Sequence, residues 1–356
     1  MFSNGPQIGE TEAALQERNV VKMAKETSLF AARLRMELGA RNRVHARDRL
    51  HVESYGNPPV IVYAPEEARH GNFFDAAYTA IMARPEWCRR FEKIHAQARS
   101  LPKAERKWRE LDSSMSSDAL LMNVFCTPGV NGSNSVRRML GVDTAEMPEK
   151  QTPEFGWRAR VPLKNGRFDR TEVDMRWGGL LVEAKLTEAD FQCCYSGVIE
   201  QYRDLDVVFE RELLPRVQIP VGRTKSSAEF PEDYSQEEKI GPGEEWQQQT
   251  WEAQREFLPG YASYQLLRNV LAAYAQGASF CVIHDARRPD LREAWYKVMA
   301  AVKDAAMRVR LKVLTWQELA AVLPEDLQEF LGAKYGIVAP GNVAPLVEAM
   351  SDLYSS

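Results

Sequence analysis

The chain has few cysteines and no long hydrophobic run. Its five cysteines are odd in number and form no C-x-x-C pair: Cys88, Cys126, Cys193, Cys194 and Cys281. This usage argues against a disulfide framework and a zinc site, and it predicts a reducing, cytoplasmic location. No apolar segment approaches the length of a membrane span, and the N-terminus lacks the layout of a signal peptide, so we expect no membrane association.

Motifs of several enzyme classes are also missing. The five histidines are scattered, and no G-x-S-x-G, H-E-x-x-H, G-x-G-x-x-G or Walker A pattern occurs. The 46 basic and 50 acidic residues give a net charge of −4. A protein that coats nucleic acid without specificity is usually more basic, but a local cleft can be positive on an acidic molecule.

One stretch, residues 172–185, is typical of a β-hairpin that turns at Gly178-Gly179, because glycine accepts the positive φ that a two-residue loop requires. Counting outwards from this turn predicts which residues face each other across the two strands. The predicted pairs are Trp177 with Leu180, Met175 with Val182, Asp174 with Glu183, and Glu172 with Lys185.

Side chains alternate along a strand, so this register sorts the hairpin into two faces. The apolar face is predicted to hold Val173, Met175, Trp177, Leu180, Val182 and Ala184. The polar face is predicted to hold Glu172, Asp174, Arg176, Glu183 and Lys185.

The polar face suggests phosphodiester chemistry. Opposed carboxylates at Asp174 and Glu183 would lie about 5 Å apart at Cβ and repel each other. A divalent cation held between them removes this repulsion, since hard cations such as Mg²⁺ take carboxylate oxygens. Lys185 on the same face could orient a water molecule or stabilise a developing negative charge.

The spacing Asp174…Glu183-Ala184-Lys185 resembles the active-site signature of the PD-(D/E)XK, or restriction-endonuclease-like, nuclease superfamily, with Val173 where a proline is usual. Three runs are similar to a bacterial family of restriction-endonuclease-like proteins, a resemblance that extends over roughly residues 60–336. They are Ser116-Ser117-Asp118-Ala119-Leu120, Glu183-Ala184-Lys185-Leu186-Thr187-Glu188 and Tyr264-Gln265-Leu266-Leu267-Arg268-Asn269.

The resemblance implies a Mg²⁺-dependent (or Mn²⁺-dependent) endonuclease that cuts nucleic acid, with DNA as the expected substrate, leaving 5′-phosphate and 3′-hydroxyl ends. Asp174 and Glu183 would bind the metal together with the backbone carbonyl of Ala184, and Lys185 would orient the attacking water. Such enzymes often form homodimers, and the sequence leaves the oligomeric state open.

Two other interpretations remain. Asp-x(n)-Glu-x-Lys is a short pattern, and a solvated hairpin face with ion pairs would look the same in a chain of which 27% is charged. A catalytically silent nucleic-acid-binding or regulatory module could also keep this fold.

The expected fold is α/β (α+β with a mixed sheet), with a restriction-endonuclease-like αβββαβ core. We expect a helical N-terminal region over 1–130, the core over 131–336 with a polar insertion at 215–259, and a peripheral tail over 337–356. Hydrophobic spacing and glycine or proline breaks predict the elements. Helices are expected over 7–38 (ending at Gly39), 76–82, 86–100, 116–125, 133–140, most of 188–214 (with Cys193 and Cys194 packed inside it), 261–276, 290–306, 315–322 and 324–335. Strands are expected over 58–63, 154–163, 169–177, 180–187, 278–284 and 309–314.

Further residues are candidates for supporting roles. By resemblance, Gln265 on the helix after the Glu-x-Lys strand would support catalysis, with a solvated helix surface as the alternative. Asp118 could lend the metal an extra acid, although a helix cap is favoured. The arginines expected to contact phosphates are Arg158, Arg160, Arg176 and Arg268, while Arg223 and Lys225 are more typical of loop charges. A basic patch could contact phosphates or form a solvated surface: Arg33, Arg35, Arg41, Arg43, His45, Arg47 and Arg49.

Overall fold

A mixed five-stranded sheet forms the centre of the computed structural model, which describes residues 12–54, 59–94, 109–142, 152–170, 172–220 and 257–341, with side chains from residue 29 onward. The strand order is β12-β11-β7-β6-β3. The strands are β3 (Glu154–Arg158), β6 (Glu172–Trp177), β7 (Leu180–Ala184), β11 (Ser279–His284) and β12 (Leu311–Thr315). β3, β6 and β7 form an antiparallel meander, and β7, β11 and β12 run parallel. This arrangement confirms the predicted mixed α+β class.

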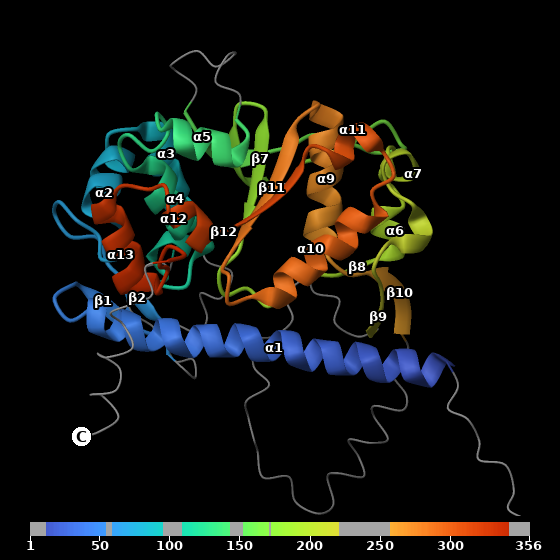
Figure 1. Cartoon of the computed structure of the whole chain (residues 1–356), viewed down its shortest axis with the longest axis horizontal. Coiled ribbons are helices and arrows are strands. Elements are labelled where there is room, and N and C mark those ends of the chain that lie inside the picture. The colour runs from blue at the N-terminus through green and yellow to red at the C-terminus, as the bar shows by residue number, and fades with distance from the viewer. Residues whose placement is uncertain are drawn as a thin grey trace, which may run out of the picture.

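Helices cover both faces of the sheet (Figure 1). The helices α9 (Tyr264–Gln276) and α10 (Pro289–Ala301) pack on one face, where Leu181, Phe280 and Val282 point. The opposite face, where Val182, Cys281 and Ile283 point, is covered by helices that come from both halves of the chain. These helices are α1 (Glu12–His45), α4 (Ser117–Cys126), α5 (Asn134–Leu140), α12 (Trp316–Ala320) and α13 (Glu325–Tyr335).

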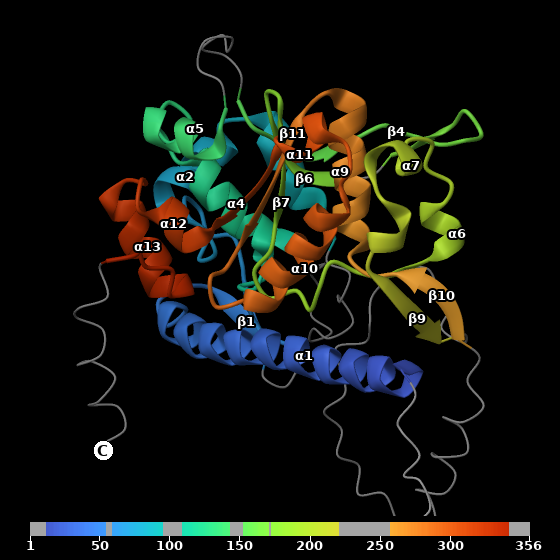
Figure 2. The same ribbon diagram turned by 45° about the vertical axis from the view of Figure 1, so that its right-hand side comes forward.

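The first helix, α1, lies across one end of the sheet in both views (Figures 1 and 2). Its predicted end at Gly39 is wrong, because the helix continues to His45. Leu34, Leu38 and Asn42 recur at helical spacing and are buried against the body of the protein. This packing offsets the intrinsic helix penalty of one glycine, about 1 kcal/mol.

Shorter elements complete the described chain. Before the sheet they are β1 (His51–Glu53), β2 (Ile61–Tyr63), α2 (Asp75–Met82), α3 (Pro85–Cys88), η1 (Arg89–Glu92) and η3 (Glu110–Asp112). Around and after the meander they are β4 (Val161–Pro162), β5 (Phe168–Asp169), β8 (Cys194–Tyr195), α6 (Ser196–Ile199), α7 (Leu205–Val208), η4 (Arg211–Leu213), β9 (Arg216–Pro220), β10 (Phe257–Tyr261) and α11 (Ala305–Arg308). Among the helices described, none combines the length and apolar character of a membrane span.

Several predicted boundaries are wrong. The helix expected from residue 86 ends at Glu92, and Ile94 instead bridges Arg109. The segment 188–214 is mostly irregular, with two helices of four residues each, and Cys194 lies in the strand β8, which pairs with β10. The strand expected over 154–163 is interrupted between β3 and β4, and the helix expected over 290–306 ends at Ala301. Contacts between distant parts of the chain determine where these elements end, and the local spacing of apolar residues carries no information about such contacts.

Other predictions concern residues beyond those described. Residues 221–256 of the predicted insertion, with Arg223 and Lys225, lie outside the described part, as do residues 342–356 of the predicted tail. The division into domains stays a prediction.

Candidate active site

The β6–β7 hairpin has the predicted register near its turn. Trp177 pairs with Leu180 and Met175 pairs with Val182. Gly178 takes a φ of 58°, which suits glycine at the first position of the turn.

Beyond Met175 the strand pairing changes. The Oδ2 atom of Asp174 accepts a hydrogen bond from the backbone N–H of Ala184 at 2.8 Å, so a carboxylate satisfies a donor that would otherwise face the neighbouring strand. Val173 packs with Trp157 in the core beneath α9, whereas Met175 packs on the other face. The prediction that Val173 shares a face with Met175 is therefore wrong, because β6 changes face at Asp174.

The cause of this change lies in β3. Gly156, whose φ is 63°, falls between Phe155 and Trp157, and these two residues pack on opposite faces of the sheet although they are two positions apart. Phe155 pairs with Met175 and Trp157 pairs with Val173. Such an irregularity in adjacent strands re-aims a side chain, as β-bulges do beside active sites. Here it directs the Asp174 carboxylate toward β7.

Glu183 and Lys185 lie together beneath α9. Both are almost fully buried, with 2% and 5% of their surface exposed. The Nζ atom of Lys185 lies 3.0 Å from Oε1 of Glu183, and Asn269 of α9 donates from Nδ2 to Oε2 of Glu183 at 2.7 Å. The Lys185 ammonium also lies 5.6 Å from the ring centre of Phe191. Each carboxylate oxygen of Glu183 thus has its own partner, and the side chain is held in one orientation.

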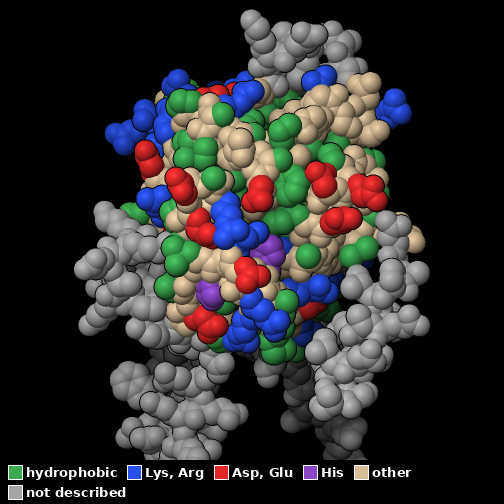
Figure 3. Space-filling model, turned by 90° about the vertical axis from the view of Figure 1, so that its left-hand side faces the viewer, with side chains coloured by type: hydrophobic (Ala, Val, Ile, Leu, Met, Phe, Trp, Pro, Cys, Tyr) green, Lys and Arg blue, Asp and Glu red, His purple; other side chains and the backbone are tan. Residues whose placement is uncertain are grey.

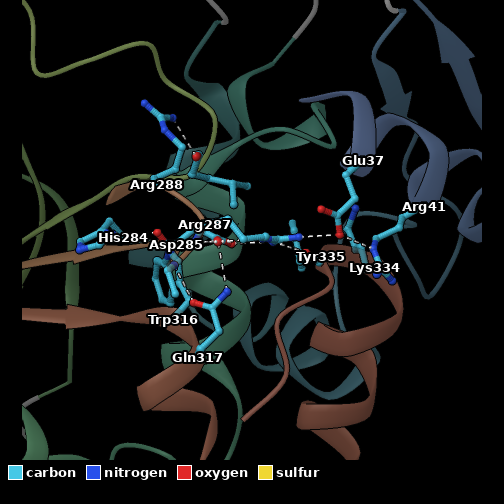
Figure 4. A network of polar contacts seen from close by, with 12 residues as sticks. Glu37, Arg41, His284, Asp285, Arg287, Arg288, Trp316, Gln317, Lys334 and Tyr335 are labelled. Atoms are coloured by element: carbon cyan, nitrogen blue, oxygen red, sulfur yellow. Dashed lines mark hydrogen bonds and ion pairs between the residues drawn. The ribbon is translucent and has the colours of Figure 1, made fainter. Parts of the chain in front are cut away.

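The backbone of Lys185 is held from both sides. Its N–H donates to the carbonyl of Ile283 at 2.8 Å, and its carbonyl accepts from Nε1 of Trp316 at 3.0 Å. The buried Arg288 then holds the following loop through hydrogen bonds to the carbonyls of Glu188 and Ala189 at 2.7 and 2.9 Å. Figure 4 shows Arg288 and Trp316 extending from the region after β11 and from α12.

A second group of charges adjoins Asp174. Asp118 of α4 accepts from Nη2 of Arg90 at 2.6 Å and from Nζ of Lys93 at 3.2 Å. Glu172 of β6 accepts from Nη1 of the same arginine at 2.7 Å and from the same lysine at 3.3 Å. The predicted capping role of Asp118 is wrong, since Ser116 caps α4 by accepting from the N–H of Ala119.

These charges shift the acidities of the site. Burial raises the pKa of Asp174 well above its ordinary value, and the nearby carboxylates of Glu183 and Asp118 raise it further. Burial opposes ionisation of Asp118, but Arg90 and Lys93 outweigh it and lower the pKa of this carboxyl. Burial alone would lower the pKa of Lys185, yet the surrounding carboxylates, Glu183 first, raise it above its ordinary value. The surroundings of Asp174 thus favour its protonated form, and Lys185 stays an ammonium.

The donor set at this position fits a hard divalent cation. Asp174 and Glu183 offer carboxylate oxygens, the ligands that Mg²⁺ prefers, and their mutual repulsion raises the pKa of Asp174. No group of three or more histidines, cysteines or acids in the described ranges is arranged to hold a metal ion. A cation here would therefore rely on few protein ligands and on water or phosphate oxygens, which is the usual situation for Mg²⁺.

The other predicted residues make contacts of their own. Gln265 forms no hydrogen bond with Glu183 or Lys185 in the described structure, and its buried Oε1 has no partner there. The guanidinium of Arg160 lies 4.4 Å from the ring centre of Phe168, that of Arg176 lies 4.8 Å from Trp157, and that of Arg268 lies 5.1 Å from Tyr264. Arg158, at the exposed end of β3, pairs in register with Glu172. Phosphate contacts by these arginines stay predictions.

The basic patch at the end of α1 is partly occupied within the protein. Arg35 donates to the carbonyl of Thr187 at 2.8 Å, and Arg41 pairs with Glu37 at 3.1 Å. Arg287, from the loop after β11, joins the same Glu37 at 2.7 Å (Figure 4). On the molecular face shown in Figure 3, basic side chains are interspersed with acidic ones. These contacts favour a structural surface over a phosphate-binding one.

Four residues of the site were not predicted: Asn269, Arg90, Lys93 and Arg288. Asn269 lies in one of the runs that carried the resemblance, five positions after Tyr264, so the sequence predicted that it is on this helix. The sequence did not predict that its side chain points toward Glu183. Arg90 and Lys93 fall in a segment expected to be a plain helix.

One of three comparisons with known proteins gave a match. Comparisons with curated proteins and with solved structures gave no match. The family described as "Restriction Endonuclease associating with ARP" matches residues 40–336, a range that includes the whole candidate site and most of the chain. The chain therefore belongs to this restriction-endonuclease-like family.

Proposed function

We propose that this protein is a divalent-metal-dependent endonuclease that hydrolyses phosphodiester bonds in DNA. One observation carries the proposal: two acids and a lysine lie together at the point where the pairing of β6 with β7 ends. They are Asp174, Glu183 and Lys185. Membership of a restriction-endonuclease-like family supports the same activity.

Asp174 and Glu183 are the proposed metal ligands, together with the backbone carbonyl of Ala184. A bound Mg²⁺ or Mn²⁺ would supply Lewis acidity and would favour deprotonation of a coordinated water. Because its pKa is raised, Asp174 would have to lose its proton when it binds the metal ion. The hydrogen bond from Asn269 keeps Glu183 in one orientation while the charges around it change.

Lys185 is proposed to act in catalysis through its positive charge. Its ammonium is buried and is paired with Glu183, so it carries a positive charge in a region of low dielectric, where charge interactions are strong. We propose that it orients the attacking water and stabilises negative charge at the phosphorus. Lys93, whose side chain is 40% exposed beside Asp118 and Glu172, is placed at the margin of the same centre and would contact a phosphate of the substrate.

The test is cleavage of plasmid DNA, single-stranded DNA and RNA with Mg²⁺, with Mn²⁺ and with chelator. Three variants are compared with wild type: Asp174→Asn, Lys185→Ala and the control Asp206→Asn on the exposed surface of α7. Asparagine at 174 can still accept the Ala184 N–H, so the strand contact survives while the charge is lost. We expect metal-dependent cutting that falls at least 100-fold in both site variants and is unchanged in the control.

Two results would contradict the proposal. Cutting that persists in both site variants would place the chemistry elsewhere or in a contaminant. Binding of nucleic acid without cutting of any substrate, and with no metal bound by calorimetry, would favour the catalytically silent binding module.

A further inference from the structure

An open cavity of about 510 Å³ lies at the start of α9, in a region to which the nuclease chemistry assigns no role. Phe168, Asp169 and Arg170 line it from the chain that leads into β6, and Val198, Tyr202 and Tyr264 line it from α6, the turn after it and the start of α9. Figures 1 and 2 show α6 and α7 on the same side of the sheet as α9.

The residues that line the cavity are close in sequence to residues of the candidate site. Asp169 precedes Glu172 by three residues in the chain. Tyr264 and Asn269, which holds Glu183, are five residues apart on the same helix, which corresponds to a rise of about 7.5 Å. The N–H of Tyr264 also donates to the carbonyl of Gln192, next to the phenylalanine that packs beneath Lys185. The cavity thus adjoins the start of the helix whose Asn269 orients Glu183.

The walls of the cavity offer a stacking surface. The ring of Phe168 is 45% exposed, and the guanidinium of Arg160 lies 4.4 Å from the centre of this ring. Tyr264, which also lines the cavity, is half-buried, and the guanidinium of Arg268 lies 5.1 Å from the centre of its ring. An exposed aromatic ring such as that of Phe168, and arginine planes near it, are groups on which nucleobases stack.

The cavity also presents ordered hydrogen-bond acceptors. The hydroxyl of Tyr202 donates to Oδ2 of Asp169 at 2.5 Å, so the hydroxyl of Tyr264, 3.3 Å away, must be the donor in its contact with Tyr202. This order leaves lone pairs on the Tyr264 oxygen. Across the described chain no donor contacts the other carboxylate oxygen of Asp169. Acceptors beside a stacking surface suit a base that carries an exocyclic amino group.

We infer that this cavity is a recognition pocket for one unstacked nucleobase of the substrate, and that it favours a base with an amino group. The pocket rests on the proposed nuclease function for its substrate, but its occupancy does not require cleavage. Enzymes that read an extruded base do so by stacking and by hydrogen bonds to its edge, as proposed here.

The test measures stacking directly, with the full-length chain in chelator so that cleavage cannot interfere. A single-stranded ten-nucleotide DNA that carries one 2-aminopurine is titrated with protein, because the fluorescence of this base falls when it stacks on an aromatic ring. Phe168→Ala is compared with Phe257→Ala, since both side chains are about half exposed but only the first lines the cavity. We expect the first variant to weaken binding about tenfold and to lose most of the quenching, and the second to match wild type.

The choice of base is tested by competition with oligo(dC) and oligo(dT). Wild type is expected to bind oligo(dC) more tightly than oligo(dT), and Asp169→Asn, which keeps an acceptor for Tyr202, is expected to lose this preference. Equal quenching by the two phenylalanine variants, or no binding of the oligonucleotide, would overturn the pocket even if cleavage requires Asp174. Quenching that depends on Phe168 in a protein that cuts nothing would retain the pocket and refute the nuclease.

Discussion

At the scale of single residues, the candidate site is a balance of closely spaced charges, several of which are buried. Asp118, Glu172, Asp174 and Glu183 bring four carboxyl groups together, and Arg90, Lys93 and Lys185 bring three cationic ones. Removing one partner of such a group leaves its neighbour as an uncompensated buried charge, which commonly costs about 3–5 kcal/mol. Variants that remove charge without removing the hydrogen bond, such as Asp174→Asn, are therefore the informative ones.

One acid at the edge of this group should make stability depend on pH. Burial, with the nearby carboxylate of Asp118, raises the pKa of Glu110 to about 7. The folded protein therefore binds a proton that the unfolded chain releases, so the free energy of unfolding should fall as pH rises from the ordinary carboxyl pKa of 4.5 to about 7. The loss attributable to this group is at most about 3 kcal/mol.

Urea unfolding at pH 5 and pH 7.5 in chelator, with wild type and Glu110→Gln, measures this effect. The variant should lose less stability than wild type between the two pH values, because glutamine does not titrate. Equal losses in the two proteins would show that Glu110 has an ordinary pKa in the fold.

At the scale of elements, the site depends on an irregularity in β3. A Cβ atom at Gly156 would lie 2.3 Å from Nη1 of Arg90, and the residue has a positive φ. We expect Gly156→Ala to lower the free energy of unfolding by about 3 kcal/mol through backbone strain and this contact together. It should also reduce cleavage, because Arg90 holds both Asp118 and Glu172.

Gly166→Ala is the matched control for this prediction. Gly166 also has a positive φ, but no atom lies within 4 Å of the position of its added Cβ. Denaturant unfolding should show a loss of about 1 kcal/mol for the control, from strain alone. If both variants lose the same stability and keep full activity, the close approach of Arg90 to Gly156 has no functional importance.

Elements formed by interactions between residues close in sequence could be predicted, and those that depend on residues distant in sequence could not. The register of β6 and β7 near their turn was predicted by counting from Gly178-Gly179, because a two-residue turn fixes the pairing locally. The shift at Asp174 was not predicted, because it depends on Gly156 in a different strand. Nor was the contact between Asn269 and Glu183, which spans 86 residues of sequence. The segment 188–214 has helical spacing but packs as irregular chain around α9, where tertiary contacts outweigh propensity.

At the scale of the whole molecule, the C-terminal part of α1 meets the last helix, α13, on one side of the sheet (Figures 1 and 2). Figure 4 shows residues of α1, of the loop after β11 and of α12 and α13 joined in one polar network. Arg287 connects Glu37 of α1 with Asp285, which is fully buried, and Asp285 also accepts from Gln317 of α12. The loop after β11 that carries this network also carries Arg288, so the packing of α1 is coupled structurally to the segment behind Lys185.

Lys334 is a fully buried lysine of this network and gives a test of how α1 is held. Its ammonium donates to Oδ1 of Asn42 on α1 and lies 4.7 Å from the ring centres of Tyr63 and Tyr335. Burial lowers its pKa well below the ordinary value of 10.5. The unfolded chain then binds a proton that the folded chain releases, so the free energy of unfolding should rise with pH between the depressed folded pKa and 10.5.

Lys334→Met removes this titration and fills the same apolar space. We expect the variant to be at least as stable as wild type at pH 7, because replacing a buried charge by an apolar side chain of similar volume is often neutral or stabilising. Denaturant unfolding between pH 7 and 9.5 should show stability that rises for wild type and stays flatter for Lys334→Met. A loss of several kcal/mol in the variant at pH 7 would mean instead that a charged Lys334, held by Asn42 and the two tyrosine rings, is what fastens α1 to α13.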